Sequence, residues 1–394
     1  MDRFGDKVNC NPKVALVKKE SFPLIDIDKI TPGYKYVRSE LTVEYTGQSG
    51  SKFQDHDILF ARITPCLENG KVAIADTNGK NGLGSTELFV FRGISGISDT
   101  DYVYYLLRMN HIKQLAANSM TGASGRQRAD LDFIKKIEWD FPIIEKQKQI
   151  AAILSSYDQL IETNNKRIKA LEQMAKSLYK EWFVRFRFPG HENAEFENGI
   201  PKGWEIKRIS DFCYVTDGTH DTPEPTTDGI PLVTGRSIKN GFVDFDSTYT
   251  ISEKDHEMIK KRSGLKTGDI LLSNIGTVGS ACVVDYYREF SVKNVIIFKP
   301  EQSYKTSYLY HLLISDSMQE IFSTQTNGSS QQFVGLTFMR RFKILIPSSS
   351  VLNMFHELIY PLSETRNILY KANQNLIKQR DLLLPRLMSG KLEV

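Results

Sequence analysis

Short runs of apolar residues, each four or five long and bounded by Gly, Asn or Asp, fill the first third of the chain and recur after residue 200. Runs such as Val72–Ala75, Leu88–Phe91 and Val295–Phe298 are rich in β-branched and aromatic residues, which is typical of β-strands. In Asp101–Ala117 the apolar residues recur instead every three or four positions, which predicts a helix. Each half of the chain is therefore predicted to hold a mostly β domain with a helix near its end.

After each of these domains the pattern changes to one long amphipathic helix. From Glu145 to Arg185 there is no Pro or Gly, and apolar residues fall near the a and d positions of a heptad repeat. The second helix carries leucines at seven-residue steps, in phase with the first. We predict that the two helices pack on each other, the alternative being that each packs only on its own domain. The predicted pairing residues are Ile153, Leu160, Leu171, Leu178, Leu362, Leu369, Leu376 and Leu383.

The two halves of the chain align with each other over more than a hundred residues. Pro23–Tyr34 matches Pro231–Phe242 at an offset of 208, and Leu131–Ile137 matches Leu336–Phe342 at an offset of 205. One such match is weak, but an ordered set of them indicates a duplicated domain. We predict an α+β protein with a pseudo-twofold repeat, in which two β-rich domains alternate with two long helices. The expected borders are 1–142 and 191–347 for the domains, and 143–190 and 348–394 for the helical spacers.

Composition excludes few functions. The chain has 394 residues, of which 40% are hydrophobic and 25% charged, and its net charge of +4 permits nucleic-acid binding without demanding it. No apolar run approaches the roughly 20 residues of a membrane span, and the N-terminus lacks an apolar signal region. We expect a cytoplasmic protein with no membrane partner. The cysteines, none in a CxxC pair and all expected to be reduced and metal-free, are Cys10, Cys66, Cys213 and Cys282.

Linear catalytic motifs are missing from the sequence. It has no P-loop, no HExxH, no GxSxG and no Asn/Asp-Pro-Pro-aromatic motif of the adenine methyltransferases. We therefore expect a chain that is not itself an enzyme, that holds no metal and that carries no cofactor. A triad assembled in space would escape this search, so a nuclease acting alone stays as a third alternative.

Two kinds of segment carry side chains suited to DNA. The loop Thr121–Arg128 and its repeat mate Thr326–Gln332 contain glycines that allow close approach to phosphates, and Arg and Gln side chains that can read guanine and adenine. The residues after the two Asp-Ile-Leu strands, and the polar loop Asp217–Pro223, form the second kind. A role in surface turns is the alternative for both. The candidate DNA-binding residues are Arg62, Lys71, Arg126, Gln127, Arg128, Thr219, His220, Arg236, Asn274, Thr277, Ser330, Gln331 and Gln332.

This organisation resembles the specificity (S) subunit of type I restriction-modification systems over essentially the whole chain. The first copy lacks a clear counterpart of one of the pieces, Pro201-Lys-Gly-Trp204, because the chain starts inside the repeat. The pieces that carry the resemblance are Pro201–Trp204, Asp217–Pro223, Gly268–Leu271 with Gly276–Gly279, Glu181–Phe183 with Phe186–His191, and Arg380–Arg386 with Ser389–Lys391.

The resemblance implies two target-recognition domains that read a bipartite, asymmetric site in double-stranded DNA, and two helices paired as an antiparallel coiled coil. It implies two methyltransferase (M) subunits as partners, and restriction (R) subunits where these are present. S-adenosylmethionine, ATP and Mg²⁺ are then expected on the partner subunits and not on this chain. The alternative function is a scaffold outside restriction that pairs two ligand-binding domains through a coiled coil.

Overall fold

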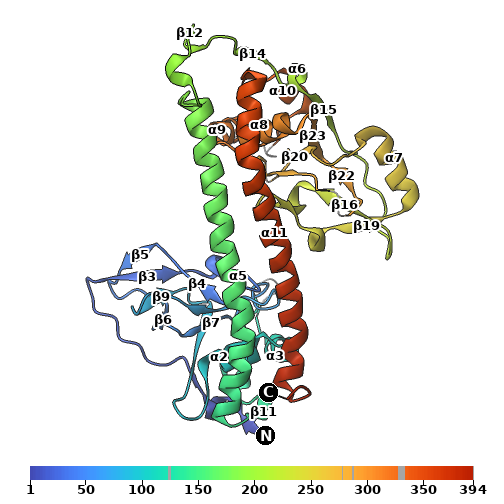
Figure 1. Ribbon diagram of the computed structural model, residues 1–394. Coiled ribbons are helices and arrows are strands. Elements are labelled where there is room, and N and C mark those ends of the chain that lie inside the picture. Colours follow the sequence, from blue (N-terminus) through green and yellow to red (C-terminus); the bar gives the residue numbers. More distant parts are fainter. Residues whose placement is uncertain (123–125, 277, 286–287, 327–332, 394) are drawn as a thin grey trace. The chain divides into compact units, whose positions relative to one another are not determined.

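The computed structural model describes residues 1–122, 126–276, 278–285, 288–326 and 333–393. The chain forms two compact units, unit 1 with residues 1–166 and 369–394, and unit 2 with residues 167–368. Two long helices, α5 (Ile144–Tyr179) and α11 (Ser349–Met388), belong to both units (Figure 1). Because this division passes through the helices, the domain borders expected at residues 142, 190 and 347 remain predictions.

The globular part of unit 1 is built on two small sheets with short helices against them. The central sheet has the order β2-β10-β7-β8-β4, antiparallel except for β4 beside β8, and the second sheet has the order β5-β3-β9-β6. The strands are β1 (Asp2–Arg3), β2 (Val8–Cys10), β3 (Ser21–Ile25), β4 (Tyr36–Val37), β5 (Thr42–Glu44), β6 (Ser51–Phe53), β7 (Ile58–Ala61), β8 (Val72–Ala75), β9 (Gly82–Gly84), β10 (Leu88–Gly93) and β11 (Glu138–Trp139). The helices are α1 (Phe4–Lys7), α2 (Thr100–Arg108), α3 (Asn110–Asn118) and α4 (Leu131–Lys135).

The central strands of unit 1 are buried on both faces, which explains why they read as unbroken apolar runs. In β7, Ile58 and Phe60 belong to the core that contains the tyrosines of α2, whereas Leu59 and Ala61 belong to a second core on the opposite face. The alternation follows from the two-residue period of a strand. The sheet is therefore held between two apolar layers.

Unit 2 repeats this plan. Its main sheet has the order β15-β23-β20-β21, and a second sheet has the order β19-β16-β22. The strands are β12 (Phe196–Glu197), β13 (Ile200–Pro201), β14 (Glu205–Arg208), β15 (Tyr214–Asp217), β16 (Ile230–Thr234), β17 (Ile238–Lys239), β18 (Phe242–Val243), β19 (Tyr249–Ile251), β20 (Ile270–Ser273), β21 (Ala281–Val283), β22 (Ser291–Lys293), β23 (Val295–Lys299) and β24 (Lys343–Ile346). The helices are α6 (Ile209–Phe212), α7 (Glu253–Ser263), α8 (Ser303–Leu313), α9 (Asp316–Thr326) and α10 (Leu336–Arg341).

Strand register confirms the predicted internal repeat. In the parallel pair β3–β9 Leu24 lies opposite Leu83, and in the parallel pair β16–β22 Leu232 lies opposite Ser291, with 208 residues between corresponding positions. In the same way Arg3 pairs with Glu138 and Arg208 pairs with Lys343, 205 residues further on. Strand β1 thus corresponds to the end of β14.

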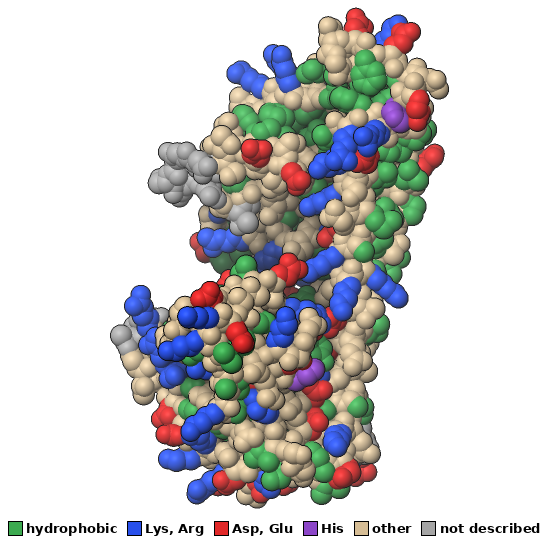
Figure 2. Space-filling model, turned by 90° about the vertical axis from the view of Figure 1, so that its left-hand side faces the viewer, with side chains coloured by type: hydrophobic (Ala, Val, Ile, Leu, Met, Phe, Trp, Pro, Cys, Tyr) green, Lys and Arg blue, Asp and Glu red, His purple; other side chains and the backbone are tan. Residues whose placement is uncertain are grey.

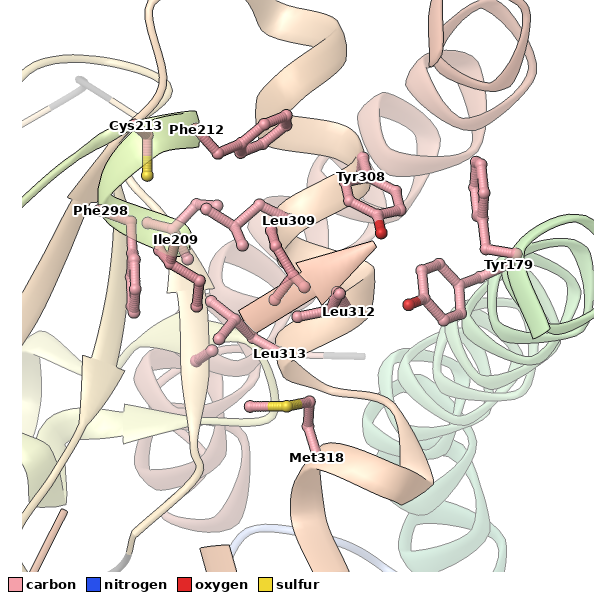
Figure 3. Close-up of a cluster of buried hydrophobic side chains, with 14 of the residues drawn as sticks. Tyr179, Ile209, Phe212, Cys213, Phe298, Tyr308, Leu309, Leu312, Leu313 and Met318 are labelled. Carbon is pink, nitrogen blue, oxygen red and sulfur yellow. The ribbon is translucent and has the colours of Figure 1, made fainter. Parts of the chain in front are cut away.

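The core of unit 2 joins the main sheet to both long helices. Tyr179 of α5 faces Tyr308 of α8, with ring centroids 6.1 Å apart (Figure 3). Phe183, in the π-helical turn Lys180–Val184 that ends α5, lies 4.8 Å from the ring of Phe355 in α11. Aromatic pairs of this kind add about 0.5–1.5 kcal/mol each beyond the area that they bury. Both helices therefore contribute side chains to the core of unit 2.

The two helices pair in antiparallel fashion, as the family resemblance implied. In unit 1 Asp158 of α5 bonds to Arg380 of α11, and Asn164 donates a hydrogen bond of 2.8 Å to Asn373. In unit 2 Glu172 of α5 pairs with Arg366. As the residue number rises along α5, the residue number of its partner in α11 falls, which is the pattern of antiparallel helices.

The buried seam, however, lies one residue away from the predicted one on α5. The buried positions are Leu154, Ile161, Ile168 and Ala175, at seven-residue steps. Of the predicted residues, Leu160 is 47% exposed, so its place in the seam was wrong, and Ile153, Leu171, Leu178, Leu362, Leu369, Leu376 and Leu383 are half-buried. The error has a physical cause, because the matching seam positions of α11 include the polar residues Asn373 and Arg380, which a hydrophobicity pattern does not detect.

Candidate nucleic-acid interface

In unit 1 the glycine-containing loop closes against the residue that follows the central strand β7. Thr121 and Arg128, at the two ends of the loop, exchange backbone hydrogen bonds of 3.0 and 3.1 Å. The next amide, that of Ala129, donates to the carbonyl of Arg62 at 2.8 Å. Two segments that the sequence proposed separately, the loop and the end of the strand, therefore form one surface element.

Unit 2 builds the equivalent element at the end of β20. The amide of Val334 donates to the carbonyl of Asn274 at 3.0 Å, and Ile275 forms a β-bridge with Phe333. The hydrogen bond from Val334 to Asn274 corresponds to the one from Ala129 to Arg62 in unit 1. Arg62 and Asn274, which the sequence alignment matches, therefore occupy equivalent positions in the two units. Four candidates of this element lie outside the described residues, namely Thr277, Ser330, Gln331 and Gln332.

The cations of the unit 1 element differ in how they are held. Arg128 makes a bidentate ion pair with Glu87, with a closest approach of 2.6 Å, and this pairing lowers the pKa of the Glu87 carboxyl. The guanidinium of Arg62 lies 4.6 Å from the ring centre of Phe89, and its Nε is buried with no hydrogen-bond partner among the described residues. Arg126 is exposed and Gln127 is half-buried. The Glu87 carboxylate is thus paired with Arg128 and also lies within electrostatic reach of Arg62.

Three other candidates are occupied by internal contacts. Lys71 donates to the carbonyl of Ile27 at 2.8 Å. Asn274 is only 3% exposed, and its amide donates to the carbonyl of Val334 at 3.3 Å. Thr219 is buried, and its hydroxyl accepts the amide of Asp221 at 3.1 Å. The side chains of Asn274 and Thr219 bond to loop backbone and expose little surface, and their predicted contact with DNA stays a prediction.

The polar loop that begins at Asp217 is packed against β22 and β23. A Cβ on Gly218 would lie 2.2 Å from the carbonyl oxygen of Val292, so only glycine fits there. His220 lies between Asn294 and Asp217, with Nδ1 2.9 Å from the Asn294 side chain and Nε2 2.9 Å from the Asp217 carboxylate. Asp217 also forms an ion pair with Arg262. The loop thus presents a fixed, largely exposed imidazole. Arg236 is exposed in a separate turn.

Comparison with known proteins agrees with this duplicated architecture. The family model for the type I restriction modification DNA specificity domain matches residues 12–173 and again residues 201–351. The chain belongs to this family.

Two relatives that this chain matches along most of their length are type I restriction enzyme specificity subunits. The MjaVIII specificity subunit of Methanocaldococcus jannaschii is 24% identical over 390 residues, which covers 94% of this chain and 89% of that protein. The HindI specificity subunit of Haemophilus influenzae is 23% identical, covering 91% and 92%. A solved type I S subunit from M. genitalium shares the fold at a TM-score of 0.56 and 15% identity, over 98% of this chain and 95% of that one.

Sequence reasoning missed Glu87, Arg262 and Asn294, which organise the candidate residues of this specificity-domain chain. The repeat carried a signal for two of them. Glu87 directly precedes the apolar run of β10, and Asn294 directly precedes the aligned run of β23. One pairs with Arg128 and the other with His220, so equivalent positions hold candidate side chains in both copies.

Positively and negatively charged side chains are mixed on the face of the molecule that Figure 2 draws. Figure 2 shows Lys and Arg side chains spread over one face of the molecule, with Asp and Glu side chains between them. This agrees with the small net charge of +4. Affinity for a polyanion would therefore come from a limited number of local cations and not from a strong overall field.

One arrangement in unit 2 has the residue types of a catalytic triad. Nδ1 of His256 lies 2.8 Å from the hydroxyl of Ser291, and Nε2 lies 3.2 Å from Glu289. Ser291 is only 1% exposed, so no substrate can reach its hydroxyl. The described residues contain no cluster of three or more His, Cys, Asp or Glu suited to a metal ion, and none of their helices is long and apolar enough to cross a membrane.

Two of the cysteines are buried, which makes their thiols unreactive. All four are free thiols. Burial raises the pKa of Cys213 to about 12 and that of Cys282 to about 12, so that neither forms a thiolate at neutral pH.

Proposed function

We propose that this chain is the DNA-binding specificity subunit of a type I restriction-modification complex, and that each copy reads one part of a bipartite, asymmetric site. The observation that carries the proposal is the paired surface element. The same loop closes on the same strand end in both copies, through Ala129 and Arg62 in one and Val334 and Asn274 in the other, while the side chains around it differ. Equivalent placement with different chemistry is what two readers of different half-sites need.

The partners and cofactors follow from this proposal. The S subunit binds two methyltransferase subunits, which use S-adenosylmethionine, and restriction subunits, which use ATP and Mg²⁺. This chain contributes binding and positioning but no reacting group. Arginine and lysine contacts with phosphate supply affinity, and contacts with base edges in the major groove supply selectivity.

The first experiment measures DNA binding by the complex of this chain with its methyltransferase subunits. We expect preference for one bipartite sequence and an affinity that falls linearly on a log–log plot as salt rises. Binding without any sequence preference would favour the scaffold alternative. The isolated chain is the control and should neither methylate DNA with S-adenosylmethionine nor cut it with Mg²⁺. Turnover by the chain alone, removed by a point mutation in it, would contradict the proposal.

The two exposed arginines give a sharper form of this experiment. Arg126→Ala should weaken the choice of base in the half-site read by unit 1 by about 1–3 kcal/mol if it pairs with a base edge. Arg236→Ala in unit 2 is the matched variant and should act on the other half-site. An equal loss on all sequences would make either residue a phosphate contact instead.

A further inference from the structure

In each unit an arginine of α11 reaches a glycine turn in the strand layer of the domain. In unit 1, Nη1 of Arg380 donates to the carbonyl of Gly33 at 2.9 Å. In unit 2, Nη2 of Arg366 donates to the carbonyl of Asn240, next to Gly241, at 2.6 Å. Gly33 and Gly241 are 208 residues apart, the offset of the repeat, and both have left-handed backbone with φ of +88° and +74°. The two turns are therefore equivalent, and each is held from the same helix.

The contact in unit 1 is part of a buried polar chain. Arg380 is only 1% exposed and pairs with Asp158 of α5. The other carboxylate oxygen of Asp158 accepts a hydrogen bond from Tyr105 of α2. Burying charges is costly unless they are paired and hydrogen-bonded, and apolar residues of similar volume are often no less stable. The network therefore has a role that apolar packing would not provide.

The contact in unit 2 uses different partners for the same purpose. The Arg366 guanidinium lies 3.9 Å from the ring centre of Phe242 and pairs with Glu172 of α5 at 2.8 Å. A Cβ on Gly241 would lie 2.2 Å from Nη2 of Arg366. Glycine is thus favoured at this turn by its backbone conformation, and a side chain there would displace the arginine.

These contacts are directional, as are the other hydrogen bonds and ion pairs between each domain and its helices, such as the pair of Arg38 with Glu162 in unit 1. In unit 1 apolar residues such as Ala151 and Leu154 of α5 lie in one core with the tyrosines of α2. Apolar contact is not directional and tolerates sliding and rotation. The hydrogen bonds of a planar guanidinium are directional. The apolar contacts and the directional contacts, including those of the two arginines, together fix the angle at which each domain sits on its helices.

A continuous path of strands leads from each turn to the candidate interface. In unit 1 the Gly33 turn enters β4, which pairs with β8, and β8 pairs with β7, which ends beside Arg62. In unit 2 the Gly241 turn joins β17 and β18, which lie against β21, and β21 pairs with β20, which ends beside Asn274. A change in the angle of the turn is therefore passed to the reading loop.

Only one of the two helices supplies these groups. Arg366, Asn373 and Arg380 follow one another at seven-residue steps along α11. The equivalent positions of α5, 205 residues earlier, are Ile161, Ile168 and Ala175. The repeat thus keeps the fold of two equal copies but anchors both of them from α11.

We propose that Arg380 and Arg366 are positioning residues, each of which sets the orientation of its own recognition domain on the helix pair and so the alignment of that domain with its half-site. The inference rests on the proposed function. It assigns no DNA contact to either arginine. Its consequence is that each arginine affects one half-site and the tolerated gap, and not the reading of the other half-site.

The test uses the complex of the full chain with its methyltransferase subunits and a DNA library. The library varies both half-sites and the length of the unread gap, and methylated sites are read by sequencing. Arg366→Met should raise, several-fold, the ratio of methylation at sites whose gap is one base pair longer or shorter to methylation at sites with the normal gap. It should relax the sequence preference only in the half-site read by unit 2. Arg380→Met should do the same for unit 1. Arg366→Lys and Arg380→Lys should restore little of the normal gap and half-site preference, because lysine keeps the charge but lacks the planar, forked guanidinium.

Matched controls separate positioning from loss of charge and loss of folding. Lys378→Met and Lys169→Met remove exposed cations from the same two helices and should leave the gap profile unchanged. Arg380→Met leaves Asp158 unpaired, so Asp158→Asn with Arg380→Met is the second variant if the single one does not fold. Variants that lower the melting temperature but keep the wild-type gap profile and half-site preferences would overturn the proposal. A wild-type complex that methylates no defined sequence would refute the proposed function instead.

Discussion

The two copies have the same fold, yet they carry different side chains where DNA would be read. Both place a parallel strand pair at the same register, Leu24 with Leu83 and Leu232 with Ser291, and both close a loop on the end of the central strand. Around that loop unit 1 gathers Arg62, Glu87 and Arg128, whereas unit 2 has a buried Asn274 and an exposed His220. Apolar alternation is enough to keep the fold, so the polar loop residues are free to diverge.

The copies also differ in how they are joined to the helices. The polar chain of unit 1 is fully buried and includes an ion pair, while the ion pair of unit 2 is partly open, with Glu172 38% exposed. Tyr105 in the first copy, which donates to Asp158, corresponds to His311 in the second, whose ring stacks beside Tyr179. The comparison predicts that unit 1 is sensitive to loss of a charge, and that unit 2 is sensitive to acid.

The largest expected effect is the loss of one partner of the buried ion pair. Asp158→Leu leaves the buried Arg380 guanidinium with only the half-exposed carboxylate of Asp381, and it should lower the free energy of unfolding by about 3–5 kcal/mol. Glu172→Leu removes a partly exposed partner of Arg366 and should cost about 0–1 kcal/mol. Denaturant unfolding of both variants measures the difference. Equal losses would mean that the two anchors are alike.

The next effect concerns acid. Burial, helped slightly by Arg366 and Lys176, lowers the pKa of His311 to about 4, although its Nδ1–H donates to the carbonyl of Ser307. The unfolded chain binds a proton near pH 6.5 that the folded chain binds only near pH 4, so stability falls as pH drops through this window. The loss should approach about 3 kcal/mol at the acid end.

The matched variant for acid sensitivity is His311→Phe, which cannot titrate. The melting temperatures at pH 7 and at pH 5 should differ more in the wild type than in the His311→Phe variant. If both chains lose the same stability between these pH values, His311 does not titrate in this way.

A smaller effect is expected at the polar centre of the helix pair. Asn373 corresponds to Ile168, and it exchanges amide hydrogen bonds with Asn164 and Asn165. Asn373→Leu should cost about 1–3 kcal/mol, because the Asn164 amide is left buried without its partner. Replacing both Asn164 and Asn373 by Leu should recover the loss, since a polar pair in a helix seam specifies register at a cost in stability. A double variant less stable than the single one would contradict this account.

Much of the fold could be predicted from the sequence, because the repeat, the strand runs and the long helices depend on local apolar periodicity. The seam between the helices could not be predicted to the residue. Asn373 and Arg380 occupy buried positions there, and their burial depends on partners more than two hundred residues away. Leucine spacing therefore pointed to Leu160, which is exposed.

The candidate interface was predictable in place but not in detail. The loop near Arg126 and the strand end at Arg62 were identified from residue type and repeat alignment, and the structure joins them. Residue type could not distinguish Asn274, which is buried, from His220, which is exposed, because exposure is decided by the surrounding chain. Glu87 carried no motif of its own and is recognisable only through the arginine that it holds.

The claim that each copy reads its own half-site is tested most directly by exchanging one copy. Residues 201–347 are replaced by the equivalent domain of another specificity subunit, and the sites methylated by the complex are sequenced. The account predicts that one half of the recognised sequence changes and the other half stays the same. A change in both halves together, or in neither, would contradict it.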